Sequence, residues 1–375
     1  MIPAVLYQDV YLYIITLLTI IYTSRLLRNH FMEPNSGPYL KRIENISSAL
    51  VLTMFMIIFI GFRPISIVFA DMAGYAQAMN DGRYEGIELS LTHNFIFYPM
   101  MGFLSSHGAS EQTPIVLLAF INFSATLIAM RKFFPKDTYI SMLVFFAAFS
   151  TFGGATNGLK AGCAGALFLM ALAYRDNKLL FFIFIMLTLG FHHSMMLPIG
   201  AAIVCLKYKK TNIYFRFWVV CLIISILHIT FFQNLFGENL AGTDEHGAKY
   251  LTTYASSIES GYTGKTGFRY DFVLYSAIPM IIYHYFNKQK NRISDTYTFL
   301  TNIYILTNAI WLLCMYANYT NRIAALSWTL YSTLIIYPFV KEVKRWNTKC
   351  DFNLCVVVLT HLFFTLFMHF VYYNN

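Results

Sequence analysis

Charged residues are scarce in this chain, and their scarcity excludes a soluble globular domain. Only 12% of the 375 residues are charged, whereas 57% are hydrophobic and 18% are aromatic. Apolar runs of roughly 15 to 20 residues, close to the length that crosses a bilayer, recur along the whole sequence. The composition therefore predicts an all-α polytopic membrane protein.

Other features that are missing exclude further classes. Cysteine is rare, at six residues, and most of the six lie inside apolar runs, so neither a disulfide framework nor a metal-ligand spacing emerges. The sequence has no Gly-rich phosphate loop, and we expect no nucleotide cofactor and no obligatory metal. The first apolar run has no basic residue before it and no small-residue cleavage site after it. We therefore expect this run to stay in the membrane and not to be removed as a signal peptide.

The net charge of +9 reflects membrane topology, and it does not indicate a nucleic-acid partner. Most of the 27 Lys and Arg residues stand in short clusters between apolar runs, where the positive-inside rule places them on the cytoplasmic side. This arrangement predicts both termini on the outer side and twelve transmembrane helices, at residues 8–24, 46–62, 114–130, 138–154, 156–174, 179–191, 194–206, 213–231, 270–287, 296–317, 323–340 and 352–371.

One apolar segment, 93–104, is too short to cross a bilayer, and we interpret it as re-entrant or interfacial. With no internal repeat and no extramembrane domain, residues 1–375 are predicted to form a single transmembrane domain. Its largest outer loops would be 63–113 and 232–269.

The predicted outer face collects residues that are costly in or beside lipid. In the stretch GFRPISIVFADMAGYAQAM, Arg63 ends the second span and Asp71 and Tyr75 follow it. If residues 65–79 form an amphipathic helix lying on the membrane, the i, i+4 spacing puts Asp71 and Tyr75 on one face. The alternative is that Arg63 only extends toward the interface and pairs with Asp71.

A second group lies in the stretch GGATNGLKAGCAG. Gly158 and Gly162 form a small-residue face suited to close helix packing, and Asn157 and Lys160 lie on neighbouring faces at the predicted outer end. Taken alone, Lys160 is equally well explained as an interfacial lysine without a function.

The third and fourth groups are the stretch GFHHSMMLP, with His192, His193 and Ser194, and the start of a late span at Arg322. A histidine titrates near neutrality and can take a proton from a hydroxyl. A single histidine in such a position is more often a hydrogen-bonded structural group, but the second histidine and Ser194 make the two interpretations equal. A guanidinium forks onto phosphate oxygens, so an arginine at an outer helix end suits a diphosphate. Three cations, a carboxylate and histidines on one membrane face would suit a lipid-linked diphosphate sugar.

The order of these motifs resembles the EpsG family of multi-pass proteins, which is related in role to the Wzy polymerases of bacterial surface polysaccharides. The resemblance covers residues 46–338 and is carried by short motifs that occur in the family's order, namely Arg63 with Asp71 and Tyr75, Asn157 with Lys160, Phe191 with His192 and Ser194, and Arg322 with Tyr331 and Pro338. Lys160 and Ala161 stand where the family tends to have Arg-Gln, a difference that keeps the charge but loses the bidentate fork.

The resemblance implies a polymerase of oligosaccharide repeat units carried on undecaprenyl diphosphate, with its active site on the periplasmic side of the bacterial inner membrane. Its helices would be compatible with a GT-C-like arrangement, its surroundings would be the lipid bilayer, and a chain-length regulator would be its protein partner. In the mechanism that we expect, His192 is the general base, and Asp71 either orients it or is itself the base. The other predicted roles are binding of the diphosphate by Arg63, Lys160 and Arg322, and contact with the substrate by Tyr75, Asn157, His193, Ser194 and Tyr250.

Three alternatives remain open at this point. A GT-C-type glycosyltransferase that uses a polyprenyl-phosphate sugar would need an acidic residue in the first outer loop, which Asp71 supplies. A non-enzymatic flippase for the lipid-linked glycan would instead place charges deep within spans. An acyltransferase acting on exported polysaccharide could use His192 and Asp71.

Overall fold

The computed structural model describes residues 2–32, 46–84, 94–232, 267–288, 293–317, 320–342 and 349–373, and within these ranges the only regular structure is helical. The predicted all-α membrane protein is therefore confirmed as a fold class. The predicted outer loops fall partly, and Tyr250 falls wholly, outside the described residues.

The N-terminal half contributes the helices that surround the candidate site. They are η1 (Ala4–Leu6), α1 (Tyr7–Met32), α2 (Ile46–Gly61), η2 (Ile67–Phe69), α3 (Asp71–Asn80), α4 (Phe97–Ser106), α5 (Gln112–Phe133), α6 (Thr138–Ala147), α7 (Phe149–Thr156), α8 (Leu159–Ala173), α9 (Lys178–Phe191), η3 (His193–Met195) and α10 (Met196–Lys207). Among them α8 packs against both α5 and α9, and α2 packs on α5.

The C-terminal half adds a second group of packed helices. They are α11 (Thr211–Ile226), α14 (Tyr270–Lys288), α15 (Asp295–Leu313), α16 (Thr320–Trp328), α17 (Tyr331–Tyr337), η5 (Pro338–Glu342), α18 (Lys349–Phe367) and η6 (Met368–Tyr372). In this group α15 packs against α10, α11, α14, α16 and α17. The first long helix, α1, packs along the last one, α18.

The number of membrane crossings is only partly settled by the described residues. Four helical stretches are long and apolar enough to cross a membrane, namely Ala4–Arg28, Gln112–Phe133, Thr320–Lys341 and Asp351–Tyr372, and a bent pair of helices would make a fifth. Five further apolar helices are shorter. The structure thus shows a polytopic helical protein, but it does not confirm the predicted count of twelve.

The predicted span at 138–154 is not one continuous helix. The helix breaks at Ala148, which is extended (φ −70°, ψ 136°), and α6 and α7 meet there at a bend of 77°. Immediately after the break, the Phe149 ring packs against Tyr275, Trp328 and Tyr373 from three other elements. This aromatic packing holds the start of α7 at an angle to α6, and the hydropathy of the segment alone could not predict that angle.

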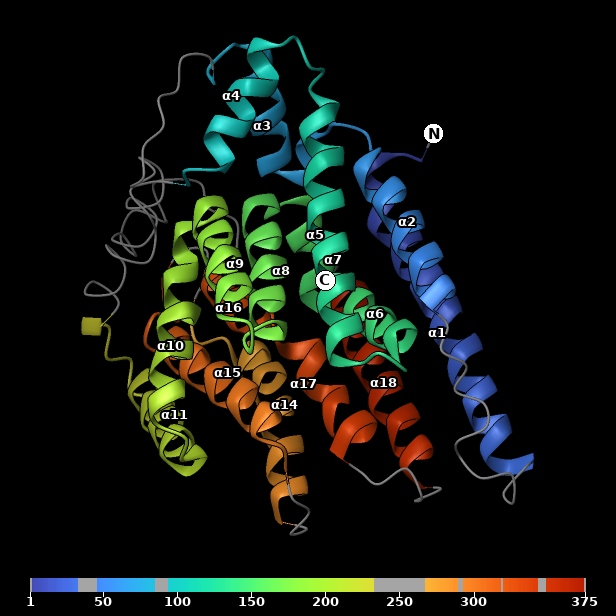
Figure 1. Ribbon diagram of the computed structural model, residues 1–375, viewed down its shortest axis with the longest axis vertical. Helices are drawn as coiled ribbons and strands as arrows, with labels where there is room; N and C mark the ends of the chain where they lie inside the picture. Colours follow the sequence, from blue (N-terminus) through green and yellow to red (C-terminus); the bar gives the residue numbers. More distant parts are fainter. Residues whose placement is uncertain are drawn as a thin grey trace.

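Two short helices lie at one end of the bundle, where the predicted site should lie. Figure 1 shows α3 and α4 at the top of the view, beyond the upper ends of α8 and α9 and beside the upper part of α5. With ten residues, α4 is about 15 Å long and cannot cross a hydrocarbon core of about 30 Å. The segment 93–104 is therefore not an ordinary span.

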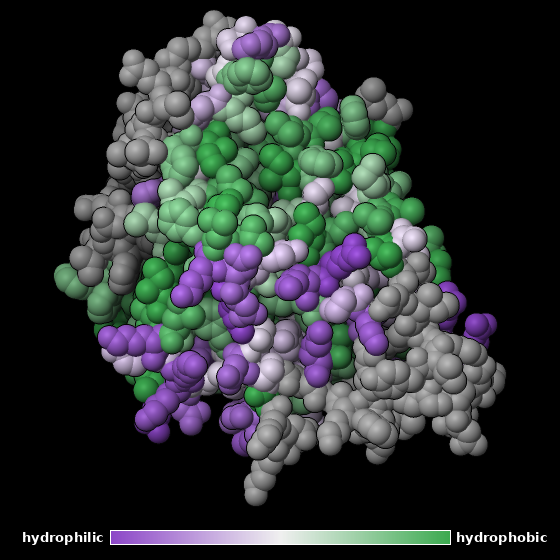
Figure 2. All heavy atoms as spheres, viewed as in Figure 1, coloured by the Kyte–Doolittle hydropathy of each residue, from purple (hydrophilic) through white to green (hydrophobic). Residues whose placement is uncertain are grey.

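The surface has the polarity that a bilayer requires. Large apolar side chains are exposed along the outward faces of α1, α2, α10 and α11, where they can face lipid. Figure 2 shows a band of hydrophobic residues, with hydrophilic residues gathered below it and a smaller hydrophilic group at the upper end. The last turns of α5, α10 and α14 carry Arg131 and Lys132, Lys207 and Lys288, and these helices run away from α3 and α4 in Figure 1. Many of the basic residues thus lie at the end opposite the candidate site.

Candidate functional site

Asp71 lies at the centre of the contacts that join the predicted site residues. It is the first residue of α3, its backbone N–H donates to Asn157 Oδ1 at 3.2 Å, and its Oδ1 accepts a hydrogen bond from Arg322 Nη2 at 2.9 Å. The ion pair is half exposed, with 50% of the Arg322 side chain and 29% of the Asp71 side chain accessible. Asp71 therefore pairs with Arg322 and not with Arg63, which had been the alternative interpretation.

The helix that carries Asp71 starts later than its amphipathic pattern predicts. Residues 67–69 form the short helix η2, capped by the Ser66 side chain, and Ala70 then adopts φ +42° before α3 begins. A non-glycine residue in this region of backbone space is uncommon, and it turns the chain so that Asp71 can meet Asn157 and Arg322. The predicted helix at 65–79 is thus wrong in its first turns. Tyr75 still lies one turn after Asp71.

Arg63 has a different environment from the one expected of a diphosphate ligand. Its side chain is 0% exposed, and its two terminal nitrogens donate to the carbonyl oxygens of Ile60 at 2.5 Å and Thr156 at 3.0 Å. Burial lowers the pKa of Arg63 to about 10, a value at which the guanidinium is still charged at neutral pH. Because the charge is enclosed by carbonyls, Arg63 ties the end of α2 to the end of α7 and presents no surface to a substrate.

Lys160 lies in the first turn of α8 within a group of aromatic rings. Its Nζ donates to the Tyr98 hydroxyl at 3.2 Å and lies 5.1 Å from the Tyr98 ring centroid, 5.4 Å from that of Phe97 and 6.0 Å from that of Tyr75. Such distances are typical of cation–π contacts. Burial raises the pKa of Tyr75, against the opposing effect of Lys160, so the Tyr75 hydroxyl stays protonated. The lysine is thus held beside α3 and α4.

The histidine pair occupies a break between two apolar helices, α9 and α10. Asn177 starts α9 by accepting the N–H groups of Leu179 and Leu180, and α9 ends at His192, whose backbone is extended. His193 then begins the single turn η3, and its N–H donates to Asn94 Oδ1 at 2.9 Å. His192 and His193 are both partly exposed, whereas Ser194 is buried.

The histidine segment docks directly on the residues that lead into α4. The N–H of Ile96 donates to the carbonyl of Gly190 at 2.8 Å, and a Cβ on Gly190 would lie 2.5 Å from the Ile96 side chain. Only glycine allows this approach without displacing a neighbour. Phe97 and Tyr98 come directly after Ile96 in the sequence, and their rings lie against Lys160. The segment 94–98 therefore contacts both the histidine segment and the lysine.

Close packing between α7 and α8 fixes the turn that carries Asn157. A Cβ on Gly162 would lie 2.4 Å from the Gly154 carbonyl oxygen and 2.8 Å from Asn122 Nδ2, which leaves no room for any other residue. At Gly158 the nearest atom would be 3.7 Å away, an ordinary contact. The predicted small-residue packing therefore depends on Gly162.

The structure thus brings together Asp71, Tyr75, Asn157, Lys160, Arg322 and the His192–Ser194 segment, and it buries Arg63 against the carbonyl of Thr156, next to Asn157. Two residues at this site, Asn94 and Tyr98, were not predicted. Asn94 is 3% exposed with φ +40°, and the only signal for it was the unusual shortness of the segment 93–104. The described residues include no group of three His, Cys, Asp or Glu side chains placed to hold a metal ion.

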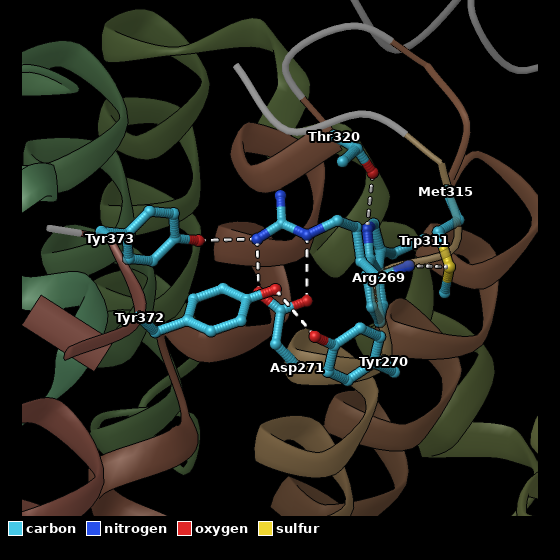
Figure 3. Close-up of polar contacts among 8 residues, drawn as sticks. All are labelled: Arg269, Tyr270, Asp271, Trp311, Met315, Thr320, Tyr372 and Tyr373. Carbon is cyan, nitrogen blue, oxygen red and sulfur yellow. Dashed lines mark hydrogen bonds and ion pairs between the residues drawn. The ribbon is translucent and has the colours of Figure 1, made fainter. Parts of the chain in front are cut away.

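A second arginine–aspartate pair, also unpredicted, lies outside this cluster. Arg269 Nε and Nη2 donate to the two oxygens of Asp271 at 2.9 and 2.6 Å, and Nη2 also donates to the Tyr373 hydroxyl at 2.6 Å (Figure 3). Its guanidinium lies 3.6 Å from the Phe272 ring centroid, and both side chains are almost fully buried. The pair joins the start of α14 to the C-terminal η6.

These observations define a polytopic helical membrane protein with a cluster of cations, a carboxylate and histidines at the end of the bundle opposite many of its basic residues. The chain belongs to the EpsG family, whose model matches residues 48–375. It is therefore a membrane protein of a family of Wzy-type polysaccharide polymerase-like proteins. Comparison with curated proteins and with solved structures finds no match.

Proposed function

We propose that this protein polymerises lipid-linked oligosaccharide repeat units for a bacterial surface polysaccharide, at the outer face of the plasma membrane. The growing glycan would pass from undecaprenyl diphosphate to a sugar hydroxyl of another lipid-linked unit. One observation carries the proposal: the Asp71–Arg322 ion pair, the Asn157 contact, the Lys160 cluster and the docked histidine segment form one set of contacts between separate parts of the chain.

The cations that would bind the diphosphate are Arg322 and Lys160. Arg322 is half exposed in the first turn of α16, and its planar guanidinium can bind two phosphate oxygens at once. Lys160 carries a compact charge on a flexible side chain. Its ammonium group lies over the Tyr98 ring and could move from there to a phosphate oxygen. Arg63 is assigned a supporting role, because its charge is already enclosed by backbone carbonyls.

In the reaction, the oxygen of the acceptor hydroxyl attacks the anomeric carbon of the growing chain. The bond between that carbon and the diphosphate oxygen breaks, and the lipid diphosphate leaves with the electron pair, its charge balanced by Arg322 and Lys160. His192 takes the hydroxyl proton, a role that an imidazole nitrogen can fill as a general base. Asp71 orients the acceptor hydroxyl, and Tyr75, Asn157 and Ser194 shape the site around it.

The test is a gel of lipid-linked glycans from a strain that lacks the gene, complemented with the wild type or with variants. Wild type should restore a ladder of polymer lengths, whereas the deletion strain should accumulate one repeat unit per lipid. His192→Ala should lower polymer formation by about 10²- to 10⁴-fold, the usual cost of losing a general base.

His193→Ala is the matched comparison, because the neighbouring histidine is anchored through its backbone N–H and the variant keeps that contact. It should cause a clearly smaller loss of polymer. Equal losses in the two variants would remove His192 from its special role. Addition of a single sugar in place of a ladder would indicate a glycosyltransferase of another kind, and a change only in acetyl content would indicate an acyltransferase.

A further inference from the structure

The Asp71–Arg322 contact engages two residues of the proposed site with each other. While the pair is formed, Asp71 occupies the position on Arg322 where a phosphate would bind. Arg322 in turn occupies the position on Asp71 where a sugar hydroxyl would bind. We propose that Asp71 is a built-in competitor of the substrate: the diphosphate displaces it from Arg322, and the released carboxylate then binds the acceptor sugar. This inference rests on the proposed function and adds an order of binding, with the diphosphate-carrying donor first and the acceptor hydroxyl second.

The pair has the properties of a contact that a stronger anion can open. It consists of one hydrogen bond of 2.9 Å, between Arg322 Nη2 and Asp71 Oδ1, at a half-exposed position. Exposed single contacts of this kind are weak, whereas a diphosphate offers several charged oxygens in the geometry that a guanidinium binds bidentately. A diphosphate should therefore win the competition for Arg322.

Opening the pair requires only a side-chain movement. The backbone of Asp71 is held by Asn157 Oδ1 through its own N–H, a contact that does not involve the carboxylate. The other partner is also anchored, because α16 is fixed by hydrogen bonds from the Trp311 indole to Thr320 and from Asn308 to Ser327. The carboxylate can thus rotate between a phosphate-bound arginine and a sugar while both helices stay in place.

Arg63 and Lys160, the other two cations, have different surroundings from Arg322. Arg63 donates to the carbonyls of Ile60 and Thr156, and Lys160 lies among aromatic rings and donates to the Tyr98 hydroxyl. Within the described residues, an ion pair that a ligand could open at this site is the one between Asp71 on α3 and Arg322 on α16.

The order of binding follows from the shared contact. In the closed pair Asp71 Oδ1 accepts from Arg322 Nη2, so this oxygen can turn to a sugar hydroxyl only after it leaves Arg322. Diphosphate binding provides that release. The acceptor would therefore be bound only when a donor is present.

The experiment measures binding of farnesyl diphosphate, a short isoprenoid diphosphate, to the full chain purified in detergent, with farnesol as the control without phosphate. Asp71→Asn removes the competitor and should tighten binding by about three- to tenfold, while Arg322→Gln should weaken it by about tenfold. The decisive variant combines both substitutions. In the Arg322→Gln background, Asp71→Asn should change binding by less than about twofold, because there is no longer an arginine to release.

Asp81→Asn is the matched control, since Asp81 forms an exposed ion pair with Arg83 just after α3 ends and lies outside the proposed site. It removes the same charge and should leave farnesyl diphosphate binding unchanged. In the gel of lipid-linked glycans, Asp71→Asn should shorten the ladder although it binds diphosphate more tightly. This opposite effect on binding and on polymer is what the order of binding requires.

The remaining outcomes each overturn a specific statement. Equal tightening by Asp71→Asn with and without Arg322 would mean simple repulsion between carboxylate and ligand, and it would overturn the competition. Unchanged or weaker binding in Asp71→Asn would overturn it as well. No binding of farnesyl diphosphate to the wild type would overturn the diphosphate site itself, and with it the proposed function.

Discussion

Two arginine–aspartate pairs in this molecule have the same chemistry and opposite surroundings. Arg269 and Asp271 are two residues apart, almost fully buried, and joined by two hydrogen bonds with a third from Arg269 to Tyr373. Asp71 and Arg322 are 251 positions apart, half exposed, and joined by one. The surroundings of an ion pair, more than its distance, therefore decide whether it can take part in binding.

The buried pair has no freedom to change partners. Each oxygen of Asp271 accepts from Arg269, and the guanidinium also lies on the Phe272 ring. Removing either charge would leave the other unpaired in a site of low dielectric, which is costly. The exposed pair can exchange its contact for water or for a ligand at small cost.

The largest effect on the folded protein is expected for Arg269→Ala. This variant leaves the Asp271 carboxylate buried without its cation, which typically costs about 3–5 kcal/mol of stability. It also removes the hydrogen bond that ties Tyr373 to the start of α14. The yield of folded protein and the midpoint of thermal unfolding in detergent should both fall strongly.

Replacing both partners separates charge burial from packing. Arg269→Met combined with Asp271→Leu leaves no unpaired charge, and such exchanges are often close to neutral. The double variant should therefore recover most of the stability that Arg269→Ala loses. A double variant as unstable as the single one would show that the pair is needed for more than charge balance.

Arg322→Ala should give the reverse pattern. Losing a half-exposed ion pair should cost less than about 1 kcal/mol, so the protein should accumulate in the membrane at nearly the wild-type level. Polymer formation should nevertheless collapse, because the lipid diphosphate loses its bidentate cation. The measurements are the membrane content of the protein and the ladder of lipid-linked glycans. A long ladder from the variant would contradict the assignment of Arg322 to the diphosphate.

The general class and the family could be predicted from the sequence because they depend on local properties. Apolar runs, basic clusters and the order of short motifs are read along the chain, and the helical membrane fold and the EpsG family are confirmed. The helix break at His192 was also predictable, because it follows a complete apolar run.

What the sequence could not provide were contacts between distant segments. Asn94 meets His193 across 99 positions and Tyr98 meets Lys160 across 62, and neither partner has a pattern that marks it. The burial of Arg63 was hidden for the same reason, since an arginine at a helix end normally extends to water. The roles assigned to the site residues stay predictions, to be tested as described above.

The smallest expected effect is also the one that distinguishes the two pairs most directly, namely the response of each pair to salt. At an ionic strength of about 0.1 M charges are screened over about 10 Å, and at about 1 M over about 3 Å, but only where solvent has access. In double-substitution cycles that follow thermal unfolding, the coupling between Asp71 and Arg322 should be about 0.2–1 kcal/mol at low salt and should approach zero at high salt. The coupling between Arg269 and Asp271 should be several times larger and should hardly change, because both side chains are buried. Parallel loss of both couplings with salt would mean that ions reach the buried pair, and the distinction between a fixed pair and an exchangeable one would then fail.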